Sequence, residues 1–243
     1  MDSAATVVRP ADAAAIARAG EIVRAGGLVA FPTETVYGLG ADASNDRAVA
    51  AIFAAKNRPQ INPLIVHVPD AEKAERLAVF SPLAHRLAQT FWPGALSLVL
   101  PRRAEAKLSL LVGAGLDTVA LRIPSSDVAH KLLSAAGMPI AAPSANVSGR
   151  ISATTAAHVA EELNGKIGMV LDGGAAALGI ESTVIGFDGD RAVLLRPGAI
   201  AREAIEKLTG PLAAPEGTCA PNASRASSGS TSRALRRNDA CGA

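Results

Sequence analysis

Short apolar runs and amphipathic stretches alternate along residues 1–210. The short runs predict buried strands, and helical spacing of apolar positions predicts helices. The expected strands are 28–31, 64–68, 96–100, 118–122, 139–142, 169–172, 182–187 and 192–195. The expected helices are 11–26, 46–56, 82–91, 125–136 and 154–163. Strands mixed with helices over this length predict an α/β sheet with helices on its faces.

Polar residues mark where several helices should begin and end. Asp12, Ser125 and Thr154 stand at N-cap positions, where a side-chain oxygen can accept a hydrogen bond from a free backbone N–H group. Gly26 and Gly27 follow the first helical pattern and predict its end.

The character of the chain changes after Gly210. Residues 211–243 are rich in Pro, Ser, Ala, Gly and Arg, and apolar periodicity stops. Such a composition cannot bury enough apolar surface to offset the conformational entropy of the chain. We therefore expect one folded domain, 1–210, followed by a disordered tail, 211–243.

Composition and charge limit the function classes. The chain has 243 residues, of which 49% are hydrophobic, and its formal net charge is +2. Four arginines and two acidic residues in 211–243 account for that charge, so the body is neutral. This argues against nucleic-acid binding driven by bulk charge, although a local basic patch is not excluded. No apolar run reaches the roughly 18 residues that span a bilayer, and no secretory leader is visible, so we expect a cytoplasmic protein without membrane contact.

The usual catalytic and nucleotide-binding signatures are absent from the sequence. Cys219 and Cys241 both lie in the final segment, which excludes a disulfide framework, a cysteine metal site and a cysteine nucleophile in the body. Neither G-x-x-x-x-G-K-[ST] nor G-x-G-x-x-G occurs, and there is no H-E-x-x-H. Any nucleotide site must therefore be built in another way.

The first unusual segment is 31–40, which continues directly from a buried strand. Its two threonines and Glu34 leave the strand end, where open α/β sheets bind their ligands. A polar turn punctuated by glycines is an equally good interpretation of this segment alone.

The second segment, 56–64, carries Lys56, Arg58 and Asn62 across a loop flanked by prolines. Lys supplies a point charge and Arg a planar fork of donors, which together suit a polyphosphate. A solvated basic loop is the commoner fate of such a pair, but the prolines favour a preformed site.

Three later segments are weaker signals. In 142–152, small hydroxyl residues and Gly149 would let backbone N–H groups approach an anion, although a loop that caps the next helix is the better interpretation of this segment alone. The segment 180–185 places hydroxyls at a strand start, which is ordinary for strands. In 194–199, Arg196 before Pro-Gly fits either a phosphate contact or a surface turn.

The order and spacing of these segments resemble the YrdC-type threonylcarbamoyl-AMP synthase family. The matching pieces are 31–40, 56–67, 118–124, 143–152, 181–185 and 195–198. The resemblance implies a YrdC-like twisted mixed sheet with helices on its faces and a concave ligand cavity. Its implied threonine contacts are Thr35, His67, Arg122, the backbone at Ala142, and Ser182. Its implied ATP contacts are Lys56, Arg58, Asn62, Thr118, Ser144, Ser152 and Arg196, with Asn146 and Thr183 lining the site.

The resemblance also implies a reaction. ATP, L-threonine and bicarbonate would give threonylcarbamoyl-adenylate and pyrophosphate, for N6-threonylcarbamoyladenosine modification of tRNA. The step requires alignment of two anions and neutralisation of charge rather than an enzyme nucleophile. Lys56, Arg58, Arg196 and a Mg²⁺ ion carried by ATP would supply that neutralisation, with Lys56 and Arg58 as the catalytic pair. A tRNA-modifying transferase complex would accept the intermediate.

Two questions stay open at the level of sequence. Longer family members carry a linker and a second domain, which 211–243 does not resemble, so this tail is either a truncated or frameshifted remnant of a two-domain form or an unrelated extension. The alternatives to the synthase are a non-catalytic module that binds tRNA or double-stranded RNA by shape, and a carbamoyl-adenylate-forming domain.

Overall fold

The computed structural model describes residues 5–213. Ten strands form one sheet in the order β1-β8-β2-β3-β7-β4-β6-β5-β9-β10. The strands are β1 (Val7–Pro10), β2 (Val29–Pro32), β3 (Tyr37–Asp42), β4 (Ile65–His67), β5 (Leu96–Pro101), β6 (Thr118–Arg122), β7 (Ile140–Ala141), β8 (Met169–Asp172), β9 (Thr183–Asp188) and β10 (Arg191–Arg196). The α-helices are α1 (Ala13–Arg24), α2 (Asp46–Lys56), α3 (Ala71–Leu77), α4 (Pro82–Phe91), α5 (Asp127–Ala136), α6 (Ala156–Leu163) and α7 (Arg202–Thr209), and a 3-10 turn spans Leu110–Gly113.

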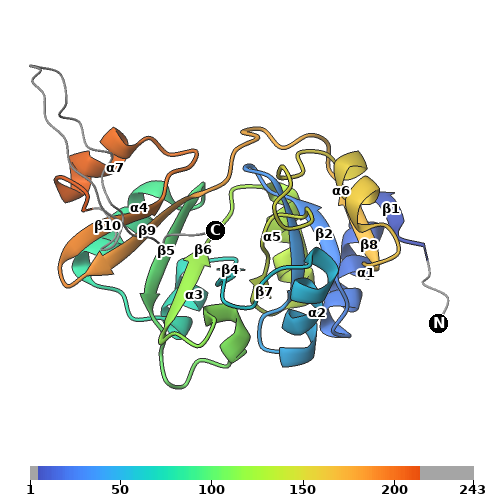
Figure 1. Ribbon diagram of the computed structural model, residues 1–243, viewed down its shortest axis with the longest axis horizontal. Coiled ribbons are helices and arrows are strands. Elements are labelled where there is room, and N and C mark those ends of the chain that lie inside the picture. The colour runs from blue at the N-terminus through green and yellow to red at the C-terminus, as the bar shows by residue number, and fades with distance from the viewer. Residues whose placement is uncertain (1–4, 214–243) are drawn as a thin grey trace, which may run out of the picture.

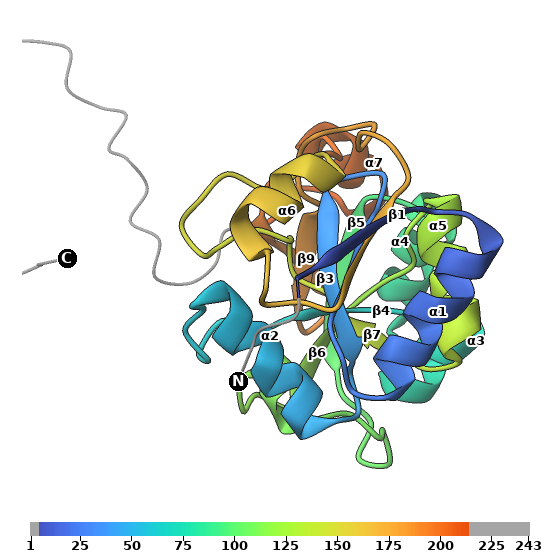
Figure 2. The ribbon, with the colours of Figure 1, turned by 90° about the vertical axis from the view of Figure 1, so that its right-hand side faces the viewer.

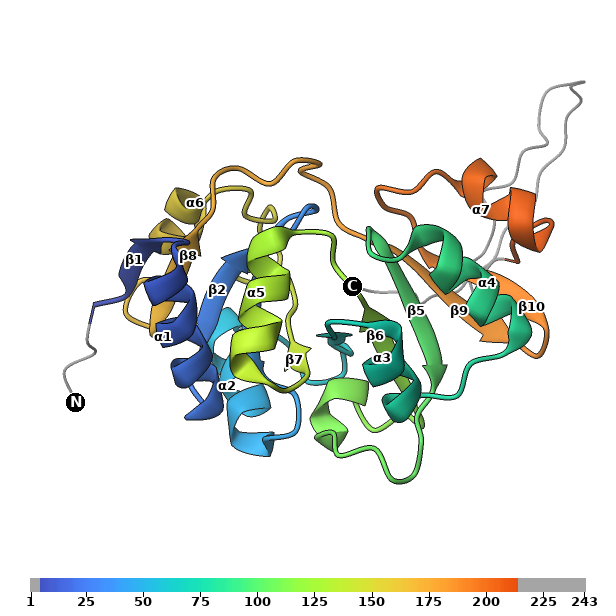
Figure 3. The same ribbon diagram turned by 180° about the vertical axis from the view of Figure 1, so that it is seen from behind.

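The sheet is mixed, as the sequence predicted. β1, β8 and β2 run parallel, β4 is parallel to β6 and β5 to β9, and the remaining neighbours are antiparallel. Figure 1 shows an elongated molecule, with β1, β8 and β2 towards one end and β5, β9 and β10 towards the other. Short strands β4, β6 and β7 lie between the two ends, seen also from behind in Figure 3.

Two hydrophobic cores hold the layers together. The smaller one lies where α1 and α5 pack side by side against β2 and β8 (Figure 2), with Ile16, Phe31 and Leu132 buried in it. A Cβ on Gly20 would lie 2.9 Å from the backbone of Ala135, so the missing side chain allows the two helices to approach closely. The larger core runs through the rest of the sheet and includes Ile52, Leu64, Leu98 and Ile185.

Helix starts follow the expected capping chemistry. The Asp12 side chain accepts a hydrogen bond from the backbone N–H of Ala15, which confirms the predicted cap of α1. Ser126 and Thr155 cap α5 and α6, so each helix begins one residue later than predicted from Ser125 and Thr154. None of the helices between residues 5 and 213 is long and apolar enough to cross a bilayer.

Strand β3 was not predicted, because its sequence contains two glycines, which are poor strand formers. A Cβ on Gly40 would lie 2.7 Å from the Phe31 ring and 2.9 Å from Ile140 Cγ2, and one on Gly38 3.3 Å from Ala142 Cβ. Glycine is therefore required by the close approach of neighbouring strands. The glycines that suggested a turn therefore belong to a buried central strand.

The folded body continues beyond Gly210. Leu212 is 5% exposed in the larger core, and Ala213 exchanges backbone hydrogen bonds with Ala192 and Leu194 of β10. The predicted start of the tail at residue 211 is therefore too early for residues 211–213. The rest of the predicted tail, 214–243, lies outside the described residues.

Candidate functional site

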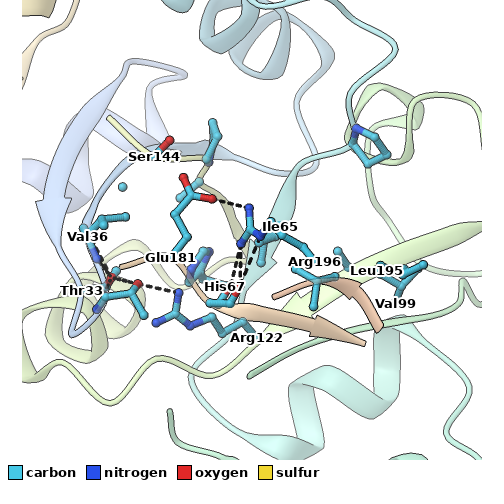
Figure 4. A pocket seen from close by; sticks show the side chains of 18 of the residues that line it. Thr33, Val36, Ile65, His67, Val99, Arg122, Ser144, Glu181, Leu195 and Arg196 are labelled. Carbon is cyan, nitrogen blue, oxygen red and sulfur yellow. Dashed lines mark hydrogen bonds and ion pairs between the residues drawn. The ribbon is translucent and has the colours of Figure 1, made fainter. Parts of the chain in front are cut away.

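A cavity of about 270 Å³ lies where several strands end (Figure 4). Seven separate stretches of the chain contribute to it, and their side chains are mainly cationic, hydroxyl or small apolar groups. The lining residues are Thr33, Thr35, Val36, Gly38, Arg58, Pro63, Ile65, His67, Val99, Ala120, Arg122, Ala142, Pro143, Ser144, Glu181, Ser182, Val184, Leu195 and Arg196. Eight of these were predicted from the sequence: Thr35, Arg58, His67, Arg122, Ala142, Ser144, Ser182 and Arg196.

Arg122 is the buried cation of this cavity. It ends β6, and its guanidinium donates to Glu34 Oε1 at 2.5 Å, to Thr35 Oγ1 at 2.9 Å and to the carbonyl of Gly94 at 3.0 Å. Burial lowers the pKa of Arg122, while the ion pair with Glu34 opposes that shift. Each of its three nitrogens uses one donor in these contacts, so two of the five N–H groups are left to face a ligand.

The 31–40 segment forms the wall beside Arg122. Thr33 Oγ1 lies 2.8 Å from Thr35 Oγ1 and donates to the carbonyl of Val36 at 2.6 Å. Both threonines are buried, and their hydroxyls are fixed by these short contacts. The tight turn between β2 and β3 thus presents the Thr35 hydroxyl and Arg122 as one unit.

His67 is a neutral, buried imidazole at the end of β4. Burial, followed by the charge of Arg122, lowers its pKa to about 3. Its Nδ1 atom has no hydrogen-bond partner among the described residues, which is costly for a buried polar atom. The ring lines the cavity, but the Nδ1 atom itself is buried.

Lys56 does not line the cavity. Its side chain is buried, and its ammonium donates to the carbonyls of Ser144 and Asn146. Burial, followed by the charge of Arg58, lowers the pKa of Lys56 to about 8. Lys56 therefore fixes the 142–152 loop from behind, whereas a direct phosphate contact was predicted.

Arg58 reaches the cavity from the loop after α2. Its Nε donates to the carbonyl of Asn62 at 3.4 Å and its Nη2 to the carbonyl of Pro63 at 3.2 Å. Burial lowers the pKa of Arg58, and Glu181 opposes that shift. Asn62 itself is exposed and supplies its backbone oxygen to Arg58 rather than its side chain to the cavity.

Glu181 and Arg196 form the opposite wall. Arg196 Nη1 pairs with Glu181 Oε2, and its Nε and Nη2 donate to the carbonyl of Ser182 at 3.2 and 2.8 Å. Glu181 Oε1 accepts a hydrogen bond from Ser152 Oγ at 2.8 Å. Burial raises the pKa of Glu181, but Arg196 and hydrogen bonds from Ser152 and Ser144 outweigh it, so that pKa lies below its ordinary value.

Three residues that the sequence predicted at the site lie outside this cavity. Asn146 is buried and donates to the carbonyls of Val147 and Arg150, although its Oδ1 has no partner among the described residues. Thr183 Oγ1 donates to the carbonyl of Ile200 at 2.9 Å. Thr118 lies on a second cavity of about 790 Å³, which shares Val99 and Leu195 with the first.

Sequence reasoning did not assign a role to Thr33, Glu34 or Glu181. Glu34 was noted only as leaving a strand end, and Glu181 stood in a segment that looked like an ordinary strand start. The contacts that give these glutamates a role join residues 88 and 15 positions apart. Because those pairings are tertiary, no local pattern indicates them.

Cation-rich walls, buried hydroxyls and a neutral imidazole give this α/β domain a site whose chemistry suits small anionic ligands. A family model, Sua5/YciO/YrdC, described as "Telomere recombination", matches residues 21–198. The chain belongs to the Sua5/YciO/YrdC family, as the sequence motifs predicted.

Two named relatives are similar over most of this chain. It is 52% identical over 198 residues to the threonylcarbamoyl-AMP synthase of Bacillus subtilis, covering 81% of this chain and 57% of the relative. It is 53% identical over 189 residues to that of Pyrococcus abyssi, covering 77% and 55%. The chain therefore spans about half the length of these relatives.

A solved structure shares the fold. Sua5 from P. abyssi complexed with L-threonine superposes with a TM-score of 0.81 and 48% identity, covering 86% of this chain and 61% of that one. The match confirms the predicted fold class.

Proposed function

We propose that this chain is an L-threonylcarbamoyladenylate synthase, which forms threonylcarbamoyl-AMP and pyrophosphate from ATP, L-threonine and bicarbonate. The observation that carries the proposal is the convergence of all five expected threonine contacts and three of the expected ATP contacts on one cavity. The expected threonine contacts in the lining are Thr35, His67, Arg122, Ala142 and Ser182. The expected ATP contacts in the lining are Arg58, Ser144 and Arg196. The named relatives support this catalytic interpretation over an RNA-binding module or a carbamoyl-adenylate-forming domain.

The buried half of the cavity suits an amino acid. Arg122 has two free N–H groups for a carboxylate, in a setting where a charge-assisted bidentate contact is strong. The His67 ring lines this half without adding charge, because its pKa of about 3 keeps the ring neutral near pH 7. The small wall at Ala142 leaves room for the side chain.

The more open half suits phosphate groups. Arg58 and Arg196 bring two cations to the cavity lining, and Ser144 adds a hydroxyl. We propose that these residues hold the triphosphate while the carboxylate of N-carboxy-threonine attacks the α-phosphorus and pyrophosphate leaves. Lys56 would act indirectly, by fixing the backbone at Ser144 and Asn146. Preorganised donors of this kind lower the barrier without a covalent intermediate.

The residues present fit a metal ion that arrives with ATP. Within residues 5–213 there is no cluster of three His, Cys, Asp or Glu side chains that could hold a metal ion. Glu181 is the only carboxylate among the described lining residues. This fits Mg²⁺, which commonly binds through one or two carboxylates together with substrate phosphates and water. Mg²⁺ would neutralise charge on the leaving pyrophosphate.

We also propose that the product passes to a tRNA-modifying transferase complex in the cytoplasm, with direct tRNA contact as a secondary expectation. An acyl-adenylate is reactive towards water, so rapid transfer to an acceptor would limit its loss by hydrolysis.

An exchange assay tests the proposed activity. Radiolabelled pyrophosphate should enter ATP only when threonine and bicarbonate are both present, because the adenylate must form reversibly. Label in ATP without either substrate, or none with both, would contradict the proposal.

A further inference from the structure

Two arginine–glutamate pairs that differ in burial place their arginines in the cavity wall, and of the two glutamates only Glu181 lines the cavity. The side chains of Arg122 and Glu34 are 4% and 12% exposed, and Glu34 also accepts a hydrogen bond from the backbone N–H of Ser125. The side chains of Arg196 and Glu181 are 39% and 32% exposed. The first pair is thus a fixed part of the wall, whereas the second pair can be opened by a ligand.

Glu181 occupies the position expected of a phosphate. Its carboxylate takes hydrogen bonds from Ser152 and Arg196, and it also interacts with Ser144 and the charge of Lys56. All four are residues for which an ATP contact was predicted. Figure 4 shows the Glu181 carboxylate pointing into the cavity towards Arg196.

Arg196 cannot serve both anions fully. Its Nε and Nη2 are committed to Ser182, and Glu181 neutralises its charge through Nη1. A phosphate that binds Nη1 must either displace the carboxylate of Glu181 or lie beside it on the second N–H of Nη1. The Glu181 main chain is held in the same wall, because Ala199 N–H donates to the Glu181 backbone carbonyl at 2.9 Å, so its carboxylate stays within side-chain reach of that phosphate.

We propose that Glu181 holds the place of a phosphate in the free site and makes the site select Mg²⁺-bound nucleotide over metal-free nucleotide. This inference rests on the proposed function. Metal-free ATP would share the cavity with the Glu181 carboxylate. The negative charges of the phosphates and of the carboxylate would then repel each other at close range. The Mg²⁺ complex instead presents a hard cation, for which a carboxylate oxygen is a preferred ligand, directly or through water.

Calorimetric titration of ATP tests the proposal by binding alone. The wild type, Glu181→Gln and Glu161→Gln are each titrated in excess Mg²⁺ and in EDTA. Glutamine keeps the size and the Ser152 hydrogen bond of Glu181 but removes its charge, whereas Glu161 is an exposed residue of α6 and serves as the matched control. Circular dichroism verifies the fold, and Glu181→Ala replaces the glutamine variant if the latter does not fold.

The wild type should bind ATP about tenfold or more tightly with Mg²⁺ than with EDTA, given the like-charge cost. Glu181→Gln should reduce that ratio by about tenfold, chiefly through tighter metal-free binding, and Glu161→Gln should leave it unchanged. An unchanged ratio in a folded Glu181→Gln variant would overturn this inference alone. Absence of ATP binding in the wild type under both conditions would overturn the proposed function as well, whereas metal-selective binding without pyrophosphate exchange would leave only the proposed reaction disproved.

Discussion

At the scale of single residues, Arg58 tests the nucleotide half of the cavity most cleanly. It lines the cavity, and its side chain makes only long contacts to the carbonyls of Asn62 and Pro63. A charge-assisted hydrogen bond contributes roughly 1.5–3 kcal/mol, so Arg58→Ala should weaken ATP binding about tenfold to a hundredfold. Calorimetry measures the dissociation constant and thermal unfolding the stability, which should change little. An unaltered dissociation constant would show that Arg58 is a solvated surface residue.

His67 gives the molecule a defined response to acid. Its pKa is about 3 when folded, against 6.5 in its ordinary state, so only the unfolded chain binds a proton between these values. Stability is therefore unaffected above pH 6.5 and falls as the pH drops below it, by about 2 kcal/mol at pH 5. Urea unfolding of the wild type and His67→Gln at pH 7 and pH 5 measures this. The wild type should lose about 2 kcal/mol more than the variant; equal losses would contradict the buried, neutral imidazole.

Some residues predicted from the sequence line the cavity, whereas others are buried behind it. Arg122, Arg196 and Ser144 reach the cavity because strand ends deliver them there. Lys56 is also a cation, but it lies on α2 behind the loop. Only its burial in the folded structure distinguishes Lys56 from a cation that faces the cavity. Glu181 could not be anticipated, because a carboxylate in a phosphate site makes sense only beside Arg196.

At the scale of elements, the turn after β10 packs directly against the backbone of the cavity wall that carries Glu181. A Cβ on Gly198 would lie 2.4 Å from the Glu181 carbonyl and from the backbone of Ser182 and Thr183. Real Cβ atoms do not approach backbone so closely, so Gly198→Ala should move the wall, destabilise the fold by about 2–4 kcal/mol and weaken ATP binding. Gly189→Ala is the control, since it has open space and should cost only about 1–2 kcal/mol from its left-handed backbone. Equal unfolding free energies for the two variants would refute the steric argument.

Most strands and helices were predictable because their periodicity is strong. Helix α4 and strands β6 and β8 have the predicted bounds. Strand β1 was missed because all four of its residues are exposed at the sheet edge, which leaves no apolar alternation to detect. Helix α7 was missed because it buries only Ile205 fully.

At the scale of the whole molecule, the end of the folded body is testable by truncation. Leu212 is buried, its N–H donates to Glu206 Oε1 at 2.9 Å, and its carbonyl accepts from Arg202 at 3.0 Å. A chain ending at Gly210 should lose about 1.5–3 kcal/mol for the leucine side chain alone, and its melting temperature should fall. A chain ending at Ala213 should melt like the full chain, as the composition of 214–243 predicts. Identical melting of all three would show that Leu212 contributes nothing.

The central claim is that this cavity joins threonine, bicarbonate and ATP, and the product itself tests that most directly. The chain is incubated with ATP, L-threonine, Mg²⁺ and ¹³C-bicarbonate, quenched rapidly and analysed by mass spectrometry, with Arg58→Ala as the comparison. We expect an adenylate that contains threonine and one ¹³C atom in the wild type, and much less of it in the variant. An adenylate without ¹³C, or no threonine-containing adenylate from folded protein that binds both ATP and threonine, would contradict the account.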